Sequence, residues 1–450
     1  MKQGIICIVF VTATCVLAQG PDTLWTKTFG GISLDFGRCA IQTSDGGYAL
    51  TGITVSWGAG ADDVYLIKTD AQGNTAWVQT YGGSGEDYGY SVVQTSDLGY
   101  IIAGYTGSYG VGGDVYLIKT DSLGDTLWTK TYGDNDSDIG FSVIEHPDGG
   151  YAITGGSYGQ GNTNVYLIKT DSAGTALWTK TYGGPDLDQG RSIALTEDDC
   201  YVIVGTTYSF GSGLYDVYLV KTDSLGDTLW TRTYGGMYDD QGYSVIILPD
   251  GGYVIAGVTS SFGAGYDDAY LIRTNSAGDT LWTKTYGGAG YDNAHSVVQS
   301  SDMGYVLTGW TMSFGAGEDD VYIIKTDSLG NHLWTQTYGG GDYDYGYSIS
   351  NTMDDGYIII GSTASFGAGA YDVWLLKTES DLGIEDSKSA VVKDKEIKTT
   401  IFSGSLQLPK DRKYKVFDIT GRVVMPDKMQ PGIYFVEVDA VITQKIVKVR

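Results

Sequence analysis

The sequence predicts an all-β fold, a seven-bladed β-propeller followed by a small C-terminal β-sandwich. A phrase of the form LWTKTYG recurs seven times at spacings of 50 to 52 residues. Each repeat holds four short segments rich in β-branched and aromatic residues, separated by Gly, Asp and Ser. No window shows a sustained helical period. Four-stranded units of about 50 residues are typical of propeller blades.

The repeat is defined by aromatic markers that keep their register through all seven copies. In one copy the four expected strands are 90–95, 99–106, 114–121 and 126–133, joined by two hairpin turns with Gly and by longer links. The strands are apolar on both faces, as blades packed between two neighbours require. A parallel β-helix is the alternative, but its repeat is normally shorter. The first marker is Trp25, Trp77, Trp128, Trp178, Trp230, Trp282 and Trp334.

The two ends of the repeat array predict how the ring closes. The array begins at 22–30 with the phrase of a fourth strand and ends at 372–379 with that of a third strand. The last blade, 347–378, therefore lacks its outer strand, and the N-terminal phrase can supply it. Closure of this kind removes the sheet edges that an open array would expose.

The N-terminal segment 1–18 reads as a signal peptide. Lys2 is followed by an apolar run that is too short to cross a bilayer, and we expect cleavage after Ala18. An uncleaved anchor is the alternative. We expect no transmembrane span after cleavage and a secreted or outer-surface location. Cys39 and Cys200 remain in the first and fourth blades, too far apart for a disulfide, and are expected to be buried free thiols.

Charge is distributed unevenly along the 450 residues, whose formal net charge is -26. Residues 19–378 carry 43 acidic and 14 basic side chains, a net of -29, whereas 379–450 have a net of +2. The predicted propeller, 19–379, is thus strongly acidic. Nucleic-acid binding and attachment to anionic lipid need a basic face, so both are excluded.

The C-terminal region differs in composition, with a polar linker expected at 380–396 and a small antiparallel β-sandwich at 397–450. The phrases KYKVFDITGRVV, PGIYFVEV and QKIVKVR resemble the type A C-terminal sorting domain of the type IX secretion system. This resemblance implies passage of the outer membrane, with a type IX-like secretion machinery as partner, and release or surface attachment. The matching positions include Asp418, Gly421, Arg422, Gly432, Tyr434 and Lys445.

The propeller repeats also resemble bacterial repeats of the DGGYviaGxT and DvyLiKtDxxGd kind. The phrases PDGGYVIAGVT and DVYLIKTDSLGD carry this resemblance. It implies a propeller and names no ligand. The three histidines, His146, His295 and His332, occupy different positions of their repeats, and no nucleophile elbow or metalloprotease motif is present. We therefore expect binding or adhesion rather than catalysis.

Two acidic positions recur, one before the first strand and one before the third strand of each repeat. In a propeller, both lie on the same face. One interpretation is that each carboxylate caps backbone N–H groups of its own turn. The other is that this face binds a glycan or a cation, with aromatic side chains beside the carboxylates. The candidates for a binding face are Asp87, Asp138, Asp188, Asp240, Asp292, Asp344, Tyr215, Tyr266 and Tyr343.

A Ca²⁺ site is the only cofactor that the sequence suggests. Asp134, Asp136 and Asp138 form the most Ca²⁺-like run, but no acidic ligand follows at a fixed spacing. The predicted function is a secreted or surface-attached, non-catalytic propeller that binds polysaccharide or a surface protein. A secreted carbohydrate-active hydrolase or lyase that uses loop carboxylates is the alternative.

Overall fold

The computed structural model describes residues 20–159, 161–381, 398–403, 414–418, 424–425, 432–438 and 441–449. The chain divides into two units, Met1–Ile384 and Glu385–Arg450. The predicted signal peptide and nearly all of the predicted linker lie outside the described residues. The described residues contain strands and no helix, so no helix there could cross a membrane.

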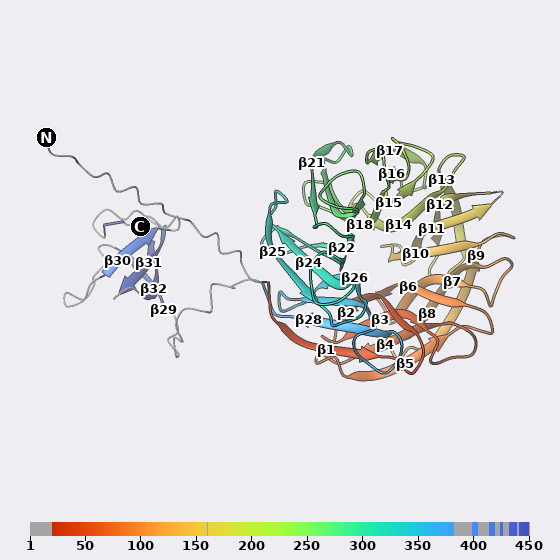
Figure 1. Cartoon of the computed structure of the whole chain (residues 1–450), viewed down its shortest axis with the longest axis horizontal. Helices are drawn as coiled ribbons and strands as arrows, with labels where there is room; N and C mark the ends of the chain where they lie inside the picture. Colours follow the sequence, from red (N-terminus) through yellow and green to blue (C-terminus); the bar gives the residue numbers. More distant parts are fainter. Residues whose placement is uncertain are drawn as a thin grey trace. The chain divides into compact units, whose positions relative to one another are not determined.

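The first unit consists of seven four-stranded antiparallel sheets arranged in a ring, which confirms the predicted seven-bladed propeller (Figure 1). Six blades are formed by four consecutive strands. These are β2–β5 (Asp35–Gln42, Tyr48–Thr54, Asp63–Thr69, Thr75–Tyr81), β6–β9 (Asp87–Gln94, Tyr100–Thr106, Asp114–Thr120, Thr126–Tyr132), β10–β13 (Asp138–Glu145, Tyr151–Gly159, Asn162–Thr170, Ala176–Tyr182), β14–β17 (Asp188–Leu195, Tyr201–Thr207, Asp216–Thr222, Thr228–Tyr234), β18–β21 (Asp240–Ile247, Tyr253–Thr259, Asp268–Thr274, Thr280–Tyr286) and β22–β25 (Asp292–Gln299, Tyr305–Thr311, Asp320–Thr326, His332–Tyr338). We number these blades 1 to 6.

Blade 7 closes the ring with a strand from the other end of the array. Its order is β1-β28-β27-β26, with β26 at Asp344–Asn351, β27 at Tyr357–Thr363 and β28 at Asp372–Thr378. Strand β1 (Thr23–Phe29) pairs antiparallel with β28, and Figure 1 shows the red first strand beside the blue last one. The prediction that the N-terminal strand completes the last blade is therefore confirmed.

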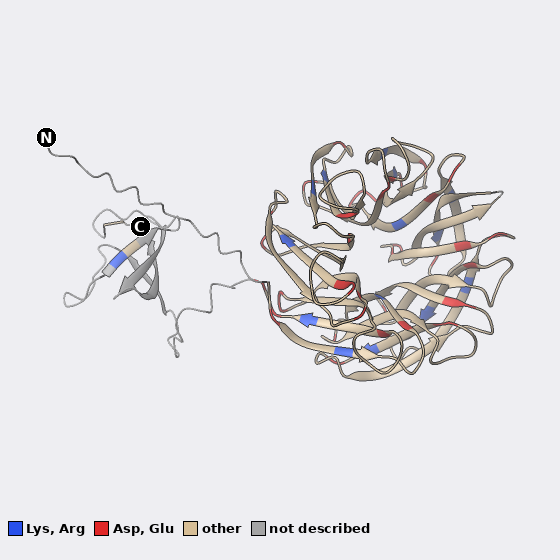
Figure 2. Cartoon of the chain, in the orientation of Figure 1, with Lys and Arg blue, Asp and Glu red and all other residues tan. Residues whose placement is uncertain are grey.

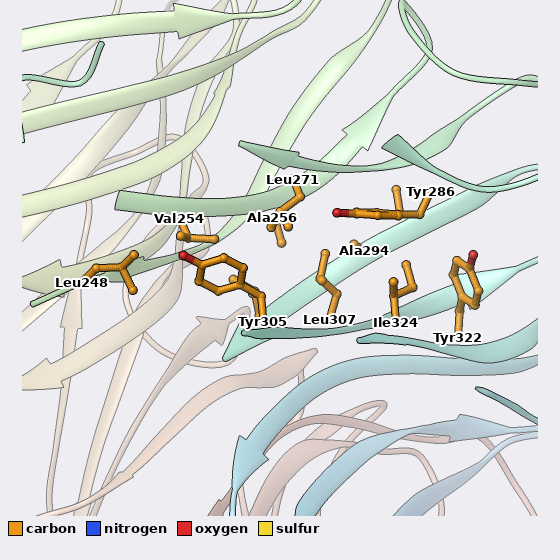
Figure 3. Packing of buried hydrophobic residues seen from close by; sticks show 12 residues of the cluster. Leu248, Val254, Ala256, Leu271, Tyr286, Ala294, Tyr305, Leu307, Tyr322 and Ile324 are labelled. Atoms are coloured by element: carbon orange, nitrogen blue, oxygen red, sulfur yellow. The ribbon is translucent and has the colours of Figure 1, made fainter. Parts of the chain in front are cut away.

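The core lies between neighbouring blades, because the middle strands are buried on both faces. Every residue of β3, β4 and β8 is buried, whereas the fourth strand of a blade is largely exposed. Figure 3 shows the cluster between blades 5 and 6, where Leu271 and Leu307 meet with no exposed surface. Burying one such side chain stabilises the fold by roughly 1.5–3 kcal/mol.

The second strand of each blade also carries a glycine that the sheet requires. A Cβ atom on Gly104 would lie 1.7 Å from the carbonyl oxygen of Tyr88 on the first strand. Any larger residue would push the first and second strands apart. This contact explains why the phrases AGYT, TGIT and IAGVT all place Gly at this point.

Several acidic side chains of the propeller pair with buried lysines at the ends of the third strands. Lys119 is 4% exposed, and its Nζ lies 2.9 Å from Asp97 in the first hairpin of the same blade. Lys169 and Asp148 repeat the pairing at 2.8 Å. A buried charge is costly without a partner, so these aspartates serve the fold.

The described residues of the second unit form one mixed four-stranded sheet of order β29-β32-β31-β30. Its strands are β29 (Lys398–Ser403), β30 (Tyr414–Asp418), β31 (Gly432–Val438) and β32 (Val441–Val449). The expectation of an antiparallel arrangement is wrong for one pair, because β29 runs parallel to β32. The chain crosses from β29 to the far edge strand β30, so β29 joins β32 without a hairpin. The predicted second layer of a sandwich lies outside the described residues.

The sorting-tail candidates fall mainly on these strands. Asp418 ends β30 and is opposite Tyr434 in β31. Gly432 begins β31, and Lys445 lies in β32 opposite Phe435. Gly421 and Arg422 lie outside the described residues.

Candidate functional site

The longer links of all seven blades lie at one end of the ring, which we call the loop face. It consists of the links from second to third strand and from fourth to first strand, for example 107–113 and 133–137. The opposite end of the ring carries the short turns from first to second and from third to fourth strand, and we call it the hairpin face. All eleven Phe, Tyr and Trp side chains that are exposed in the described chain lie in the links of the loop face, and none lies on the hairpin face. They are Trp57, Tyr109, Tyr208, Phe210, Tyr238, Phe262, Tyr266, Tyr291, Phe314, Tyr343 and Phe366.

The acidic candidates at the start of the first strands are buried beneath this face. Asp87, Asp138, Asp188, Asp240, Asp292 and Asp344 are at most 1% exposed. In each, Oδ2 accepts a hydrogen bond of 2.7 to 3.1 Å from the backbone N–H four residues earlier. In five of them the same oxygen accepts a bond of 2.5 to 2.7 Å from a Ser hydroxyl of the neighbouring link. These contacts favour the interpretation that the carboxylates hold the links together.

The second acidic set lies next to the first. Asp216 Oδ2 accepts a 2.7 Å hydrogen bond from the backbone N–H of Ser212. A Cβ atom on Gly235 would lie 2.0 Å from Asp216 and 2.7 Å from Asp240, so the two carboxylates flank this glycine. Burial, and secondly the charge of Asp240, raise the pKa of Asp216 to about 6. Equivalent pairs recur at the other blade boundaries; at one of them Asn164 replaces the first Asp.

The predicted calcium residues lie on the same face with different exposures. Asp134 and Asp136 are exposed, whereas Asp138 is buried. The backbone N–H of Asp136 donates to Asp134 at 2.9 Å, and that of Asp134 donates to Asp138 at 3.1 Å. Within the described ranges, no group of three or more His, Cys, Asp or Glu side chains is placed to hold a metal ion. Ca²⁺ binding stays a prediction.

The three tyrosine candidates reach the surface to different extents. Tyr266 is 65% exposed and stacks on Tyr291, with ring centroids 4.9 Å apart and planes 11° apart. Tyr343 is 39% exposed and stacks on Tyr345. Tyr215 is half-buried and meets Tyr208 edge-on at 5.0 Å. The structure therefore places aromatic rings, and not the first-strand carboxylates, where a ligand in solvent could touch them.

A ring of side chains inside the central channel was not predicted from the sequence. Each first strand has a β-bulge that adds one residue, and the added residues meet around the channel. The ring centroids of Tyr90 and Phe141 are 5.1 Å apart, and Tyr243 stacks on His295 with ring centroids 4.7 Å apart. The seven added residues are Arg38, Tyr90, Phe141, Arg191, Tyr243, His295 and Tyr347.

The channel ring carries cations within an acidic propeller, whose Asp and Glu residues outnumber Lys and Arg (Figure 2). The Arg38 guanidinium carbon lies 4.5 Å from the centre of the Tyr347 ring, and that of Arg191 lies 4.2 Å from the Phe141 ring. Burial, followed by the charges of these two arginines, lowers the pKa of His295 to about 3. His295 is therefore neutral at neutral pH.

Comparison with known proteins gives no family for the chain. No protein-family model matches. The chain is similar to the regulatory protein FlaEY of Caulobacter vibrioides, with 28% identity over 176 residues, 33% of this chain and 18% of FlaEY. It thus spans less than a fifth of the length of that relative.

Solved structures with a similar fold share little sequence identity with the chain. The Pan2 WD40 domain of Neurospora crassa is 9% identical, with a TM-score of 0.49 over 82% of this chain and 98% of that one. Sqt1 of Chaetomium thermophilum is 14% identical, with a TM-score of 0.46, and the match covers 76% of this chain and 83% of Sqt1. PorZ, a surface component of the type-IX secretion system of Porphyromonas gingivalis, is 13% identical, with a TM-score of 0.43. This match covers 92% of this chain and 59% of PorZ. Such low identities do not indicate what the chain binds.

Proposed function

We propose that this chain is an exported, non-catalytic binding protein that engages a polysaccharide through the loop face of its propeller. The observation that carries the proposal is that all eleven aromatic side chains found exposed among the described residues lie on that face. Exposed rings cost free energy in water, and gathered aromatic side chains typically mark a surface that meets a partner. A flat ring also suits the apolar face of a sugar.

The buried carboxylates support binding rather than catalysis. Hydrolysis of a glycoside needs one apposed pair of carboxyl groups that a substrate can reach. Here the acidic pairs recur at successive blade boundaries, and the Asp216–Asp240 pair is at most 2% exposed. Export by a type IX-like route and a location outside the cell belong to the proposal through the resemblance of the C-terminal region. A surface protein is the other partner class that an aromatic face fits.

A glycan array tests the proposal. The mature chain is applied with and without Ca²⁺, and every bound glycan is then incubated with the protein and examined for products. We expect binding to at least one polysaccharide class without turnover. Turnover of a bound glycan would instead support the hydrolase or lyase alternative. Absence of all binding would refute the proposed function and leave a structural role. Loss of binding without Ca²⁺ would establish the predicted cation dependence.

A further inference from the structure

One pocket differs from the rest of the loop face in its chemistry. It has a volume of about 240 Å³ and lies at the loop-face end of the channel, where blades 3, 4 and 5 meet. Its walls combine one cation, two amides, two hydroxyls and two tyrosine rings. The lining residues are Tyr158, Thr163, Leu187, Gln189, Arg191, Thr206, Tyr215 and Gln241.

The cation of this pocket is Arg191, which has no anionic partner among the described residues. Phe141 covers one face of its guanidinium, and its buried Nε makes no hydrogen bond. Arg38 at the equivalent bulge of blade 1 is in the same state, because its buried Nε also makes no hydrogen bond, whereas the buried lysines of the third strands are paired, as Lys169 is with Asp148. Arginine presents a planar set of donors that matches a carboxylate in a bidentate manner. The pocket therefore offers a site for a negative charge.

Two buried hydroxyls of the same pocket also lack partners. Thr163 is 0% and Thr206 is 6% exposed, and neither Oγ1 forms a hydrogen bond. A buried polar group left in this state costs about 1–3 kcal/mol. Two amides lie beside them: Gln189 donates to Tyr158 Oη at 2.5 Å, and Gln241 accepts from Tyr243 Oη at 3.0 Å. These groups provide donors and acceptors for the hydroxyls of a ligand.

The loop face differs in charge from blade to blade at the residue that precedes the recurring Asp or Asn of the third strand. This residue is Tyr215 in blade 4, Gly113 in blade 2, Thr163 in blade 3 and Tyr371 in blade 7. Three other blades have an aspartate at this position, namely Asp62, Asp267 and Asp319. Blades 3 and 4 therefore place no carboxylate at this position; Asp239 is nevertheless near, because its Oδ1 accepts a 3.3 Å hydrogen bond from the backbone N–H of Tyr215, so the attraction for an anion comes from Arg191.

We propose that this pocket binds one carboxylate-bearing sugar, a hexuronate residue of a polysaccharide. Its carboxylate would pair with Arg191, its ring would lie against Tyr215, and its hydroxyls would meet the amides and threonines. The volume is below the roughly 300–1,000 Å³ of pockets for drug-sized ligands, which suits a single sugar residue. An extended peptide would need a long groove, whereas this pocket is a compact cavity of about 240 Å³ enclosed by side chains of three blades.

Titration calorimetry with the mature chain tests the pocket. The probes are oligomers of galacturonate, guluronate and glucuronate, each compared with the same oligomer after reduction of its carboxyl groups to hydroxymethyl groups. We expect at least one uronate oligomer to bind at least tenfold more tightly than its reduced form. Failure of all three to bind, or equal affinity of the reduced forms, would overturn the proposal.

Three variants locate the binding. Arg191→Met should weaken uronate binding at least tenfold and leave the affinity for reduced oligomers unchanged. Arg38→Met, at the equivalent bulge of blade 1 and outside this pocket, should change the affinity less than twofold. Thr206→Val removes an unpaired hydroxyl, so it should weaken binding three- to tenfold without lowering the melting temperature. Unchanged uronate affinity in both Arg191→Met and Thr206→Val would refute the site.

This inference rests on the proposed function only in using the loop face as the binding face, and the two fail differently. Array hits confined to neutral glycans would overturn the uronate pocket and leave the proposed function standing. No array hit and no uronate binding would overturn both.

Discussion

Replacing Asp216 by Asn should stabilise the protein at neutral pH. Asp216 is 2% exposed, and its hydrogen bond from Ser212 needs an acceptor but not a charge. Burial, and the neighbouring charge of Asp240, raise its pKa from 3.8 to about 6. The folded state thus keeps a proton that the unfolded state has already lost. Wild-type stability therefore falls as the pH rises through this window, from about 4 to about 6.

The magnitude follows from the size of that shift. About two pKa units at about 1.4 kcal/mol each give an upper limit of about 3 kcal/mol for the cost of the charge above pH 6. Asp216→Asn should remove this cost and raise the free energy of unfolding at pH 8 by up to that amount. At pH 4 the two proteins should differ little, because the wild-type carboxyl is then neutral in the folded state.

The chain offers a matched control at blade 3, where Asn164 occupies the equivalent position beside Asp188. Asn164→Asp should lower stability at pH 8 and have a smaller effect at pH 4. Denaturant unfolding of the mature chain and both variants between pH 4 and 8 measures these changes. If Asp216→Asn were less stable than wild type at pH 8, or if its effect did not depend on pH, the reasoning would be refuted.

Three further predictions concern the ring, the thiols and the tail. Deleting residues 20–30 removes β1 and should lower the melting temperature sharply, because blade 7 then exposes the edge of β28; an unchanged temperature would contradict closure by this strand. Thiol titration of the denatured mature protein should find two groups, Cys39 and Cys200, both free in the fold, and fewer would indicate a disulfide. Deleting residues 397–450 should retain the protein inside the outer membrane, and normal export would argue against a sorting role.

The repeat spacing was sufficient to predict the blades and the closure. The marker tryptophans, and the tyrosine that begins the second strand of every blade, recur because each blade packs on two neighbours, so the same side chains are needed seven times. Tyr305, for example, is 2% exposed in the cluster between blades 5 and 6. The repeat spacing also placed Cys39 and Cys200 in distant blades, and both cysteines are free as predicted. The prediction that both are buried is confirmed for Cys200, whereas Cys39 is half-buried.

The candidate site was predicted less completely, for physical reasons. Regular spacing indicates that Asp87 and its equivalents are needed in each blade, but it does not separate a capping carboxylate from an exposed one. Arg191 was missed because a β-bulge directs it to the channel, and a one-residue bulge leaves no mark on repeat length. Its only sequence signal was that charge replaces an aromatic residue at that position, as it also does at Arg38. In the tail, pairing between β29 and β32 depends on a crossover that strand patterns do not specify.

The central claim is that the exposed rings of the loop face bind ligand. It is tested most directly by the affinity of the best array glycan for wild type, Tyr266→Ala and Leu225→Ala. Tyr266 is 65% exposed on the loop face, and Leu225 is 62% exposed on the hairpin face. We expect a Kd at least fivefold higher for Tyr266→Ala than for wild type and an unchanged Kd for Leu225→Ala. Equal affinity for all three proteins would contradict the central claim.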